Sequence, residues 1–110
     1  MAITINIYYR GQNGAARKFA EEMVASGIVQ EIRAEAGNLR YEYFFPMEDP
    51  ETVLLIDSWK DQSSLDAHHE LPLMGQIMAL REKYDLHMTV ERYCSDADGV
   101  SSHDQTFIRE

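Results

Sequence analysis

The strongest constraint on the fold lies in the middle of the chain, where a turn sequence separates two apolar runs. Residues 39–45, L-R-Y-E-Y-F-F, alternate so that Leu39, Tyr41, Tyr43 and Phe45 share one face of a strand. Residues 46–50, P-M-E-D-P, are typical of a turn. The V-L-L-I core of residues 51–60 is apolar on both faces, as in a central strand. The pattern predicts a β-hairpin.

A strand and a helix precede this hairpin. Residues 1–9 alternate apolar and polar side chains, which predicts a strand with one covered face. Helix formers dominate residues 15–35, where apolar side chains recur at four or five residues. Gly27 is a candidate break in that helix, and Gly37 with Asn38 is a candidate end.

Helix and strand patterns also follow the hairpin. Asp61 can cap a short helix that begins at Gln62, and Pro72 disfavours the helical conformation of Leu71. A second helical piece is expected over residues 73–84, and a last strand over residues 87–93. The resulting order is β-α-β-β-α-β.

This order favours a ferredoxin-like α+β fold, a four-stranded antiparallel sheet with both helices on one face. The other face would expose apolar and aromatic side chains, and a second copy of the chain could cover it, so a homodimer is expected. We expect one domain over residues 1–94 and a tail over residues 95–110. The tail ends in T-F-I-R, which could pair as an edge strand in its own sheet or in a partner's.

Composition excludes several classes of function. The formal net charge of −9 disfavours binding to nucleic acid and to anionic membrane surfaces. No apolar run approaches the roughly 20 residues that cross a bilayer. Cys94 is the single cysteine, and the N-terminus lacks a leader pattern, so the reducing cytoplasm is the expected location.

Two adjacent histidines, His68 and His69, are the first candidates for chemistry. On a helix both flank the row of Leu65, which is expected to face the sheet. Each could be a half-buried structural residue or a general acid or base. Adjacent helical residues point about 100° apart, and no His or Cys pair has ligand spacing, so no metal site is predicted. No cofactor fingerprint is present either.

Polar and aromatic residues of the predicted strands are further candidates. Asp57 and Trp59 share one strand face, where the indole could be core packing or a wall for an aromatic substrate. Tyr41 and Tyr43 also share a face, and their phenols could either pack or bind a substrate oxygen. Asn6 lies on the opposite face from the isoleucine row of the first strand.

Residues 33–72, R-A-E-A-G-N-L-R-Y-E-Y-F-F-P-M-E-D-P-E-T-V-L-L-I-D-S-W-K-D-Q-S-S-L-D-A-H-H-E-L-P, resemble the antibiotic biosynthesis monooxygenase (ABM) superfamily. The resemblance rests on an E-x-G motif, a strand Tyr, a D-P turn, an acidic-x-Trp motif and a helical His. These are Glu35 and Gly37, Tyr41, Asp49-Pro50, Asp57 and Trp59, and His68.

The resemblance implies a ferredoxin-like chain that pairs sheet to sheet as a dimeric α/β barrel. It implies cofactor-independent oxygenation, with O2, of a small quinol-like or phenolic substrate. His68 would then be the catalytic proton acceptor or hydrogen-bond partner, and Trp59 the pocket wall. Tyr41, Asn6 and Asp57 would be polar substrate contacts.

Two departures from the family pattern leave other functions open. Asp57 replaces the commoner Glu, and Leu73 stands where members often carry a second His, for which His69 is not an obvious substitute. One alternative is a non-enzymatic dimeric module that binds a small ligand. Another is an isomerase-like enzyme that degrades a phosphorylated autoinducer, against which the acidity and the lack of basic pocket residues argue. A haem-degrading variant ranks last, because the His position follows the monooxygenase pattern.

Overall fold

The computed structural model describes residues 1–110 and contains a four-stranded antiparallel sheet in the order β2-β3-β1-β4. The elements are β1 (Ile3–Arg10), α1 (Ala15–Ala25), α2 (Ile28–Arg33), β2 (Asn38–Phe44), β3 (Thr52–Trp59), α3 (Gln62–His69), α4 (Leu73–Lys83), β4 (His87–Cys94) and α5 (Ser102–Gln105). The predicted ferredoxin-like fold class is confirmed. No helix has the length and apolar character required to cross a membrane.

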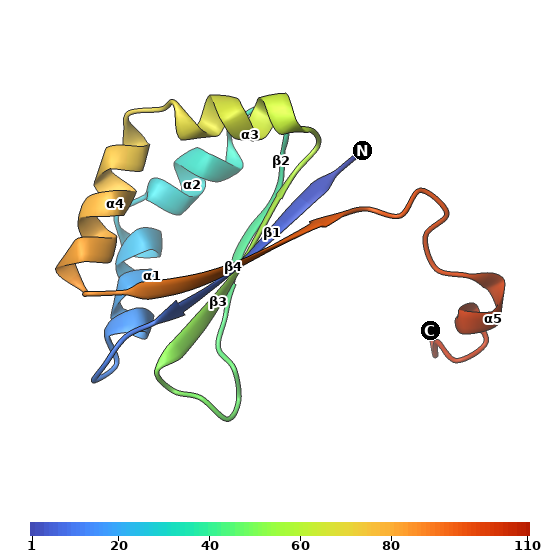
Figure 1. The fold of residues 1–110 in the computed structure, drawn as a ribbon, viewed down its shortest axis with the longest axis horizontal. Coiled ribbons are helices and arrows are strands. Elements are labelled where there is room, and N and C mark those ends of the chain that lie inside the picture. The colour runs from blue at the N-terminus through green and yellow to red at the C-terminus, as the bar shows by residue number, and fades with distance from the viewer.

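Helices α1 to α4 gather on one side of the sheet (Figure 1). The core lies between the two layers, where Phe19 and Met23 of α1 meet Val53 and Leu55 of β3, all essentially inaccessible to solvent. The other face of the sheet carries no helix. This arrangement leaves one face of β1 and β3 available for a further layer.

Both helical regions are divided where the sequence contains a breaker. Gly27 adopts a φ of +87°, a left-handed conformation that glycine reaches without a Cβ clash. The helix predicted over residues 15–35 is therefore split at Gly27 into α1 and α2. Pro72 stands at the start of α4, so the expected interruption at Leu71-Pro72 is also present.

Gly37 fixes the connection between α2 and β2 against α3. Its φ is +85°, and a Cβ there would overlap the side chain of Ser64. Its carbonyl oxygen accepts a hydrogen bond from the Lys60 amide at 2.9 Å. Only glycine fits this close approach, which brings the end of α2 beside the first turns of α3.

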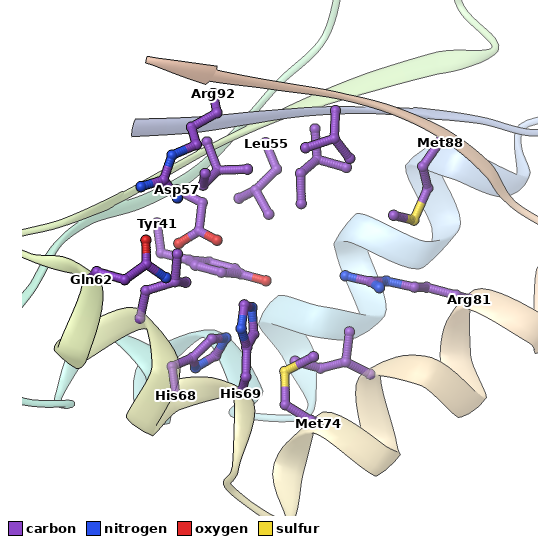
Figure 2. A pocket seen from close by; sticks show the side chains of 15 residues that line it. Tyr41, Leu55, Asp57, Gln62, His68, His69, Met74, Arg81, Met88 and Arg92 are labelled. Carbon is purple, nitrogen blue, oxygen red and sulfur yellow. The ribbon is translucent and has the colours of Figure 1, made fainter. Parts of the chain in front are cut away.

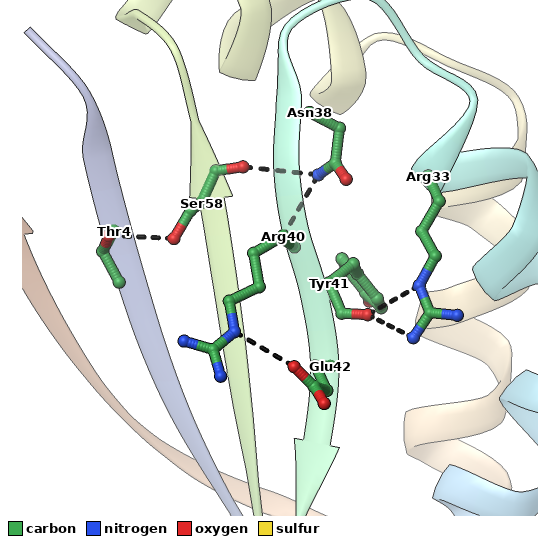
Figure 3. Close-up of polar contacts among 7 residues, drawn as sticks. All are labelled: Thr4, Arg33, Asn38, Arg40, Tyr41, Glu42 and Ser58. Carbon is green, nitrogen blue, oxygen red and sulfur yellow. Dashed lines mark hydrogen bonds and ion pairs between the residues drawn. The ribbon is translucent and has the colours of Figure 1, made fainter. Parts of the chain in front are cut away.

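The predicted shared face of β2 is only partly correct. Tyr41 is buried, whereas Leu39 is 59% exposed because the pairing of β2 with β3 is irregular between Asn38 and Arg40. Phe45 lies beyond the strand end and is 47% exposed. Figure 3 shows the Asn38 amide donating to the carbonyls of Arg40 and Ser58 at this irregularity, at 3.3 and 3.4 Å.

The tail leaves the body after β4 and ends in the short helix α5 (Figure 1). Residues 106–109 form no strand in this chain, so the expected edge strand is not part of its own sheet. Phe107 and Ile108 are exposed. Pairing of this segment with a partner chain stays a prediction.

Candidate active site

A cavity of about 340 Å³ opens between the inner face of the sheet and helices α3 and α4 (Figure 2). This volume lies in the range of small-molecule sites. It is lined by Ile5, Ile7, Tyr41, Leu55, Asp57, Gln62, Leu65, His68, His69, Met74, Ile77, Arg81, Met88, Val90 and Arg92. Most of this lining is apolar, so the few polar side chains define where a ligand can hydrogen-bond.

Strand register explains part of this lining. Tyr41 pairs with Asp57, Asp57 with Ile5, and Ile5 with Arg92, so these four residues form one row across all four strands. Facing residues of antiparallel strands point to the same side of a sheet, here toward the helices. The Tyr41 backbone is also held by Arg33, which donates Nε and Nη2 to its carbonyl oxygen at 3.0 and 2.8 Å (Figure 3).

His68 lies on α3 with only 3% of its surface exposed. The side chain of Asp61 caps α3 by accepting from the Ser64 amide at 2.9 Å, which sets where the helix begins. Nδ1 of His68 lies 3.0 and 2.9 Å from the two carboxylate oxygens of Glu35. Its ring packs on Trp59 with 4.8 Å between centroids. The imidazole is therefore fixed on two sides.

Trp59 supports the site from behind. It is fully buried, does not line the cavity, and donates its indole N–H to Asp57 Oδ1 at 2.7 Å. Trp59 is therefore not part of the cavity lining, and a direct contact between its indole and a substrate stays a prediction. In this chain Trp59 lies one layer below the cavity surface, where it positions the Asp57 carboxyl and the His68 ring.

The cavity changes the protonation of its acidic and phenolic groups. Burial raises the pKa of Asp57 to about 6, and the hydrogen bond from Trp59 and the nearby His68 oppose that rise. Burial also raises the pKa of the Tyr41 phenol well above its usual range. Near neutral pH the Tyr41 phenol is therefore neutral, whereas the Asp57 carboxyl is mostly ionised and gains a proton as the pH falls through about 6.

Three further polar residues of the site, Gln62, Arg81 and Arg92, were not singled out from the sequence, whereas His69 was one of the two candidate histidines. His69 is exposed at the cavity edge, with its ring centroid 5.6 Å from that of His68, and burial together with the charges of His68 and Arg81 lowers its pKa. Arg81 of α4 and Arg92 of β4 also line the cavity, which corrects the expected lack of basic pocket residues. Arg81 follows the core residue Ile77 by one helical turn, and this spacing could have revealed it.

Two residues singled out from the sequence lie outside the cavity. Asn6 faces the opposite side of the sheet, where its Oδ1 is buried without a hydrogen-bond partner, so it is not a contact in this cavity. Leu73 is 8% exposed and belongs to the core cluster. No group of three or more His, Cys, Asp or Glu side chains is placed to hold a metal ion.

The family model for antibiotic biosynthesis monooxygenase matches residues 2–80, so the chain belongs to this family. Bacillus subtilis (strain 168) YcnE is 29% identical over 68 residues, which is 62% of this chain and 70% of YcnE.

Solved structures share the fold. PA3566 of Pseudomonas aeruginosa has a TM-score of 0.74 at 23% identity, covering 87% of this chain and 95% of PA3566. SnoaB, a cofactor-independent oxygenase of Streptomyces nogalater, has a TM-score of 0.71 at 10% identity, covering 86% of this chain and 93% of SnoaB. At these identities the likeness concerns the fold alone.

Proposed function

We propose that this chain is a cofactor-independent monooxygenase that oxidises a small quinol-like or phenolic substrate with O2. Family membership and the oxygenase name of SnoaB support this reaction class. The observation that carries the proposal is His68, held by Glu35 at the wall of a largely apolar cavity.

His68 is the proposed proton acceptor. A carboxylate only accepts hydrogen bonds, so Glu35 favours the tautomer in which Nδ1 of His68 carries the proton. Nε2 then keeps a free lone pair, which can take the proton of a substrate hydroxyl. The resulting phenolate is electron-rich enough to react with O2.

The proposed oxidation balances without an external reductant. A quinol and O2 give a hydroxyquinone and water: one oxygen atom forms a bond to ring carbon and replaces hydrogen, and the other leaves as water. The substrate supplies all four electrons that O2 accepts: two as the quinol becomes a quinone, and two as one ring C–H becomes C–OH. The nine apolar residues of the lining reduce the number of groups that can hold water beside the reacting anion.

Tyr41 and Asp57 are the proposed polar partners of the reacting oxygens. The phenol of Tyr41 points into the cavity (Figure 2) and can donate to the developing anion. Asp57, with a pKa raised to about 6, can supply a proton to reduced oxygen. Trp59 contacts both Asp57 and His68, so it positions the group that takes the substrate proton and the group that supplies a proton to reduced oxygen.

We also propose that the protein works as a homodimer. The uncovered sheet face carries Ile56 beside Asn6, both only partly exposed, and the Oδ1 atom of Asn6 is buried without a partner. A second sheet packed there would cover the apolar side chains. Light scattering at micromolar concentration should give twice the chain mass, and a stable monomer would contradict the barrel.

One observation favours a second candidate, a non-enzymatic ligand-binding module. Leu73, at the position of the family's second His, is buried in the core and offers no proton-transfer group. An oxygen-uptake screen over small quinols with no added cofactor separates the two. Uptake supports the oxygenase, whereas silence together with ligand-induced thermal stabilisation supports the binding module.

A further inference from the structure

Arg81 is a charged group inside the cavity that the proposed proton transfer does not use. It projects from α4 toward the cavity interior (Figure 2), and its Nη2 donates to the Tyr9 hydroxyl at 2.9 Å. Its Nε is buried without a hydrogen-bond partner, and no carboxylate of the chain lies within 4.0 Å of its guanidinium. A guanidinium stays charged at any working pH, and partly buried charges are normally paired.

The lining carries a positive excess although the whole chain is strongly acidic. Arg81 and Arg92 are its permanent cations, and Asp57 is its one carboxyl group. The formal charge of the chain is −9, so this local sign is opposite to that of the molecule. An anionic ligand would meet attraction here and repulsion over most of the remaining surface.

We infer that the substrate is a phenol or quinol that carries a carboxylate, and that Arg81 binds this carboxylate. The inference rests on the proposed function, whose reacting end is His68. Figure 2 shows Arg81 on the opposite side of the cavity from Arg92 and Asp57. Arg81 is therefore separated from Arg92, and a ligand group placed at Arg81 meets a single guanidinium. A planar carboxylate matches the fork of one guanidinium, whereas a phosphate dianion is better served by two converging cations.

Matched ligand pairs test the charge preference without turnover. 4-Hydroxybenzoate and 4-hydroxyphenylacetate would each be compared with the corresponding neutral amide by calorimetry in oxygen-free buffer. Because a charge-assisted hydrogen bond is stronger than a neutral one, the carboxylate should bind about tenfold more tightly or better. Equal affinity within each pair, or no measurable binding by any of the four compounds, would overturn the inference.

Variants of Arg81 and Arg17 test which residue causes the preference for the carboxylate over the amide. Arg81→Gln should reduce the carboxylate-to-amide ratio to about one, and Arg81→Lys should keep part of it because the charge remains. Arg17→Gln is the matched control, since Arg17 also has a buried Nε without a hydrogen-bond partner. Arg17 lies outside the cavity, with its Cζ 4.2 Å from the centroid of the Phe45 ring. It should keep the full ratio.

Three results would contradict the proposed binding of a carboxylate by Arg81. A preference that survives in Arg81→Gln, or that disappears in Arg17→Gln, contradicts the assignment to Arg81. Tighter binding of 4-hydroxybenzylphosphonate than of 4-hydroxyphenylacetate would favour a phosphorylated substrate and contradict the carboxylate. The wild-type comparison needs no variant to fold, and it is independent of oxygen uptake, so this inference and the proposed reaction can fail separately.

Discussion

Both carboxylate oxygens of Glu35 lie within hydrogen-bonding distance of Nδ1 of His68, at 3.0 and 2.9 Å, although 33 residues separate the two in sequence. The contact joins the end of the first helical region to α3. It depends on Gly37, whose missing side chain lets the α2–β2 connection approach Ser64. The same glycine turn therefore shapes the backbone and orients the candidate base.

Glu35 is the group that accepts a hydrogen bond from Nδ1 of His68, and removing it should leave the imidazole as a mixture of its two tautomers. In Glu35→Ala the buried Nδ1–H loses its partner, which should cost about 1–3 kcal/mol of stability and lower the turnover number more than it changes KM. Glu35→Gln keeps a carbonyl acceptor and should retain more activity. Nitrogen NMR of the His68 ring would show Nδ1–H in the wild type and a tautomer mixture in Glu35→Ala. An unchanged tautomer in both variants would remove the positioning role of Glu35.

Asp57 should make stability fall as pH rises. Its folded-state pKa is about 6, above the ordinary value of 3.8, so folding favours the protonated form. That contribution is fully present below about pH 4 and is lost as the pH rises through about 6. Asp57→Asn remains uncharged and can still accept from Trp59. It should be about as stable as the wild type in acid and more stable near pH 8, by at most about 3 kcal/mol.

Urea unfolding of Asp57→Asn and the wild type at several pH values measures this difference directly. A gap between the two proteins that does not change from about pH 4 to about pH 8 would show that Asp57 titrates normally in the folded protein.

Gly37→Ala should destabilise the protein, because the new Cβ overlaps Ser64 and the residue must hold a φ of +85°. A loss of about 2 kcal/mol or more is expected. Gly75→Ala is the matched control: Gly75 lies inside α4 with nothing within 4 Å of an added Cβ, so a gain of about 0.5–1 kcal/mol is expected. Equal effects at the two sites, measured by urea unfolding, would contradict the close approach at Gly37.

The order of elements could be predicted from the sequence because each one carries a local signal. Alternation marks β1, and the breakers Gly27 and Pro72 mark the helix ends. The exposure of Leu39 could not be predicted in this way, since strand alternation assumes regular pairing and the irregularity depends on how β2 meets β3. The T-F-I-R segment has strand composition, yet in this chain it has no sheet edge beside it.

In the candidate site, too, some features follow from local sequence patterns and others depend on tertiary packing. Helix geometry placed both His68 and His69 beside the row of Leu65, and only the resemblance to the ABM family favoured His68. The pairing of His68 with Glu35 depends on tertiary packing, which no local pattern encodes. For the same reason the sequence could place Trp59 on the face of Asp57 but could not show that it lies behind the cavity.

Oxygen uptake by His68→Ala and His69→Ala tests the central claim most directly. With a small quinol that the wild type consumes without added cofactor, His68→Ala should abolish uptake, because the Glu35-bound imidazole is the proposed proton acceptor. His69→Ala should keep most of it, because His69 lies at the exposed cavity edge and its ring makes no hydrogen bond to another side chain. Equal loss in the two variants, or full uptake by His68→Ala, would contradict the assignment of His68.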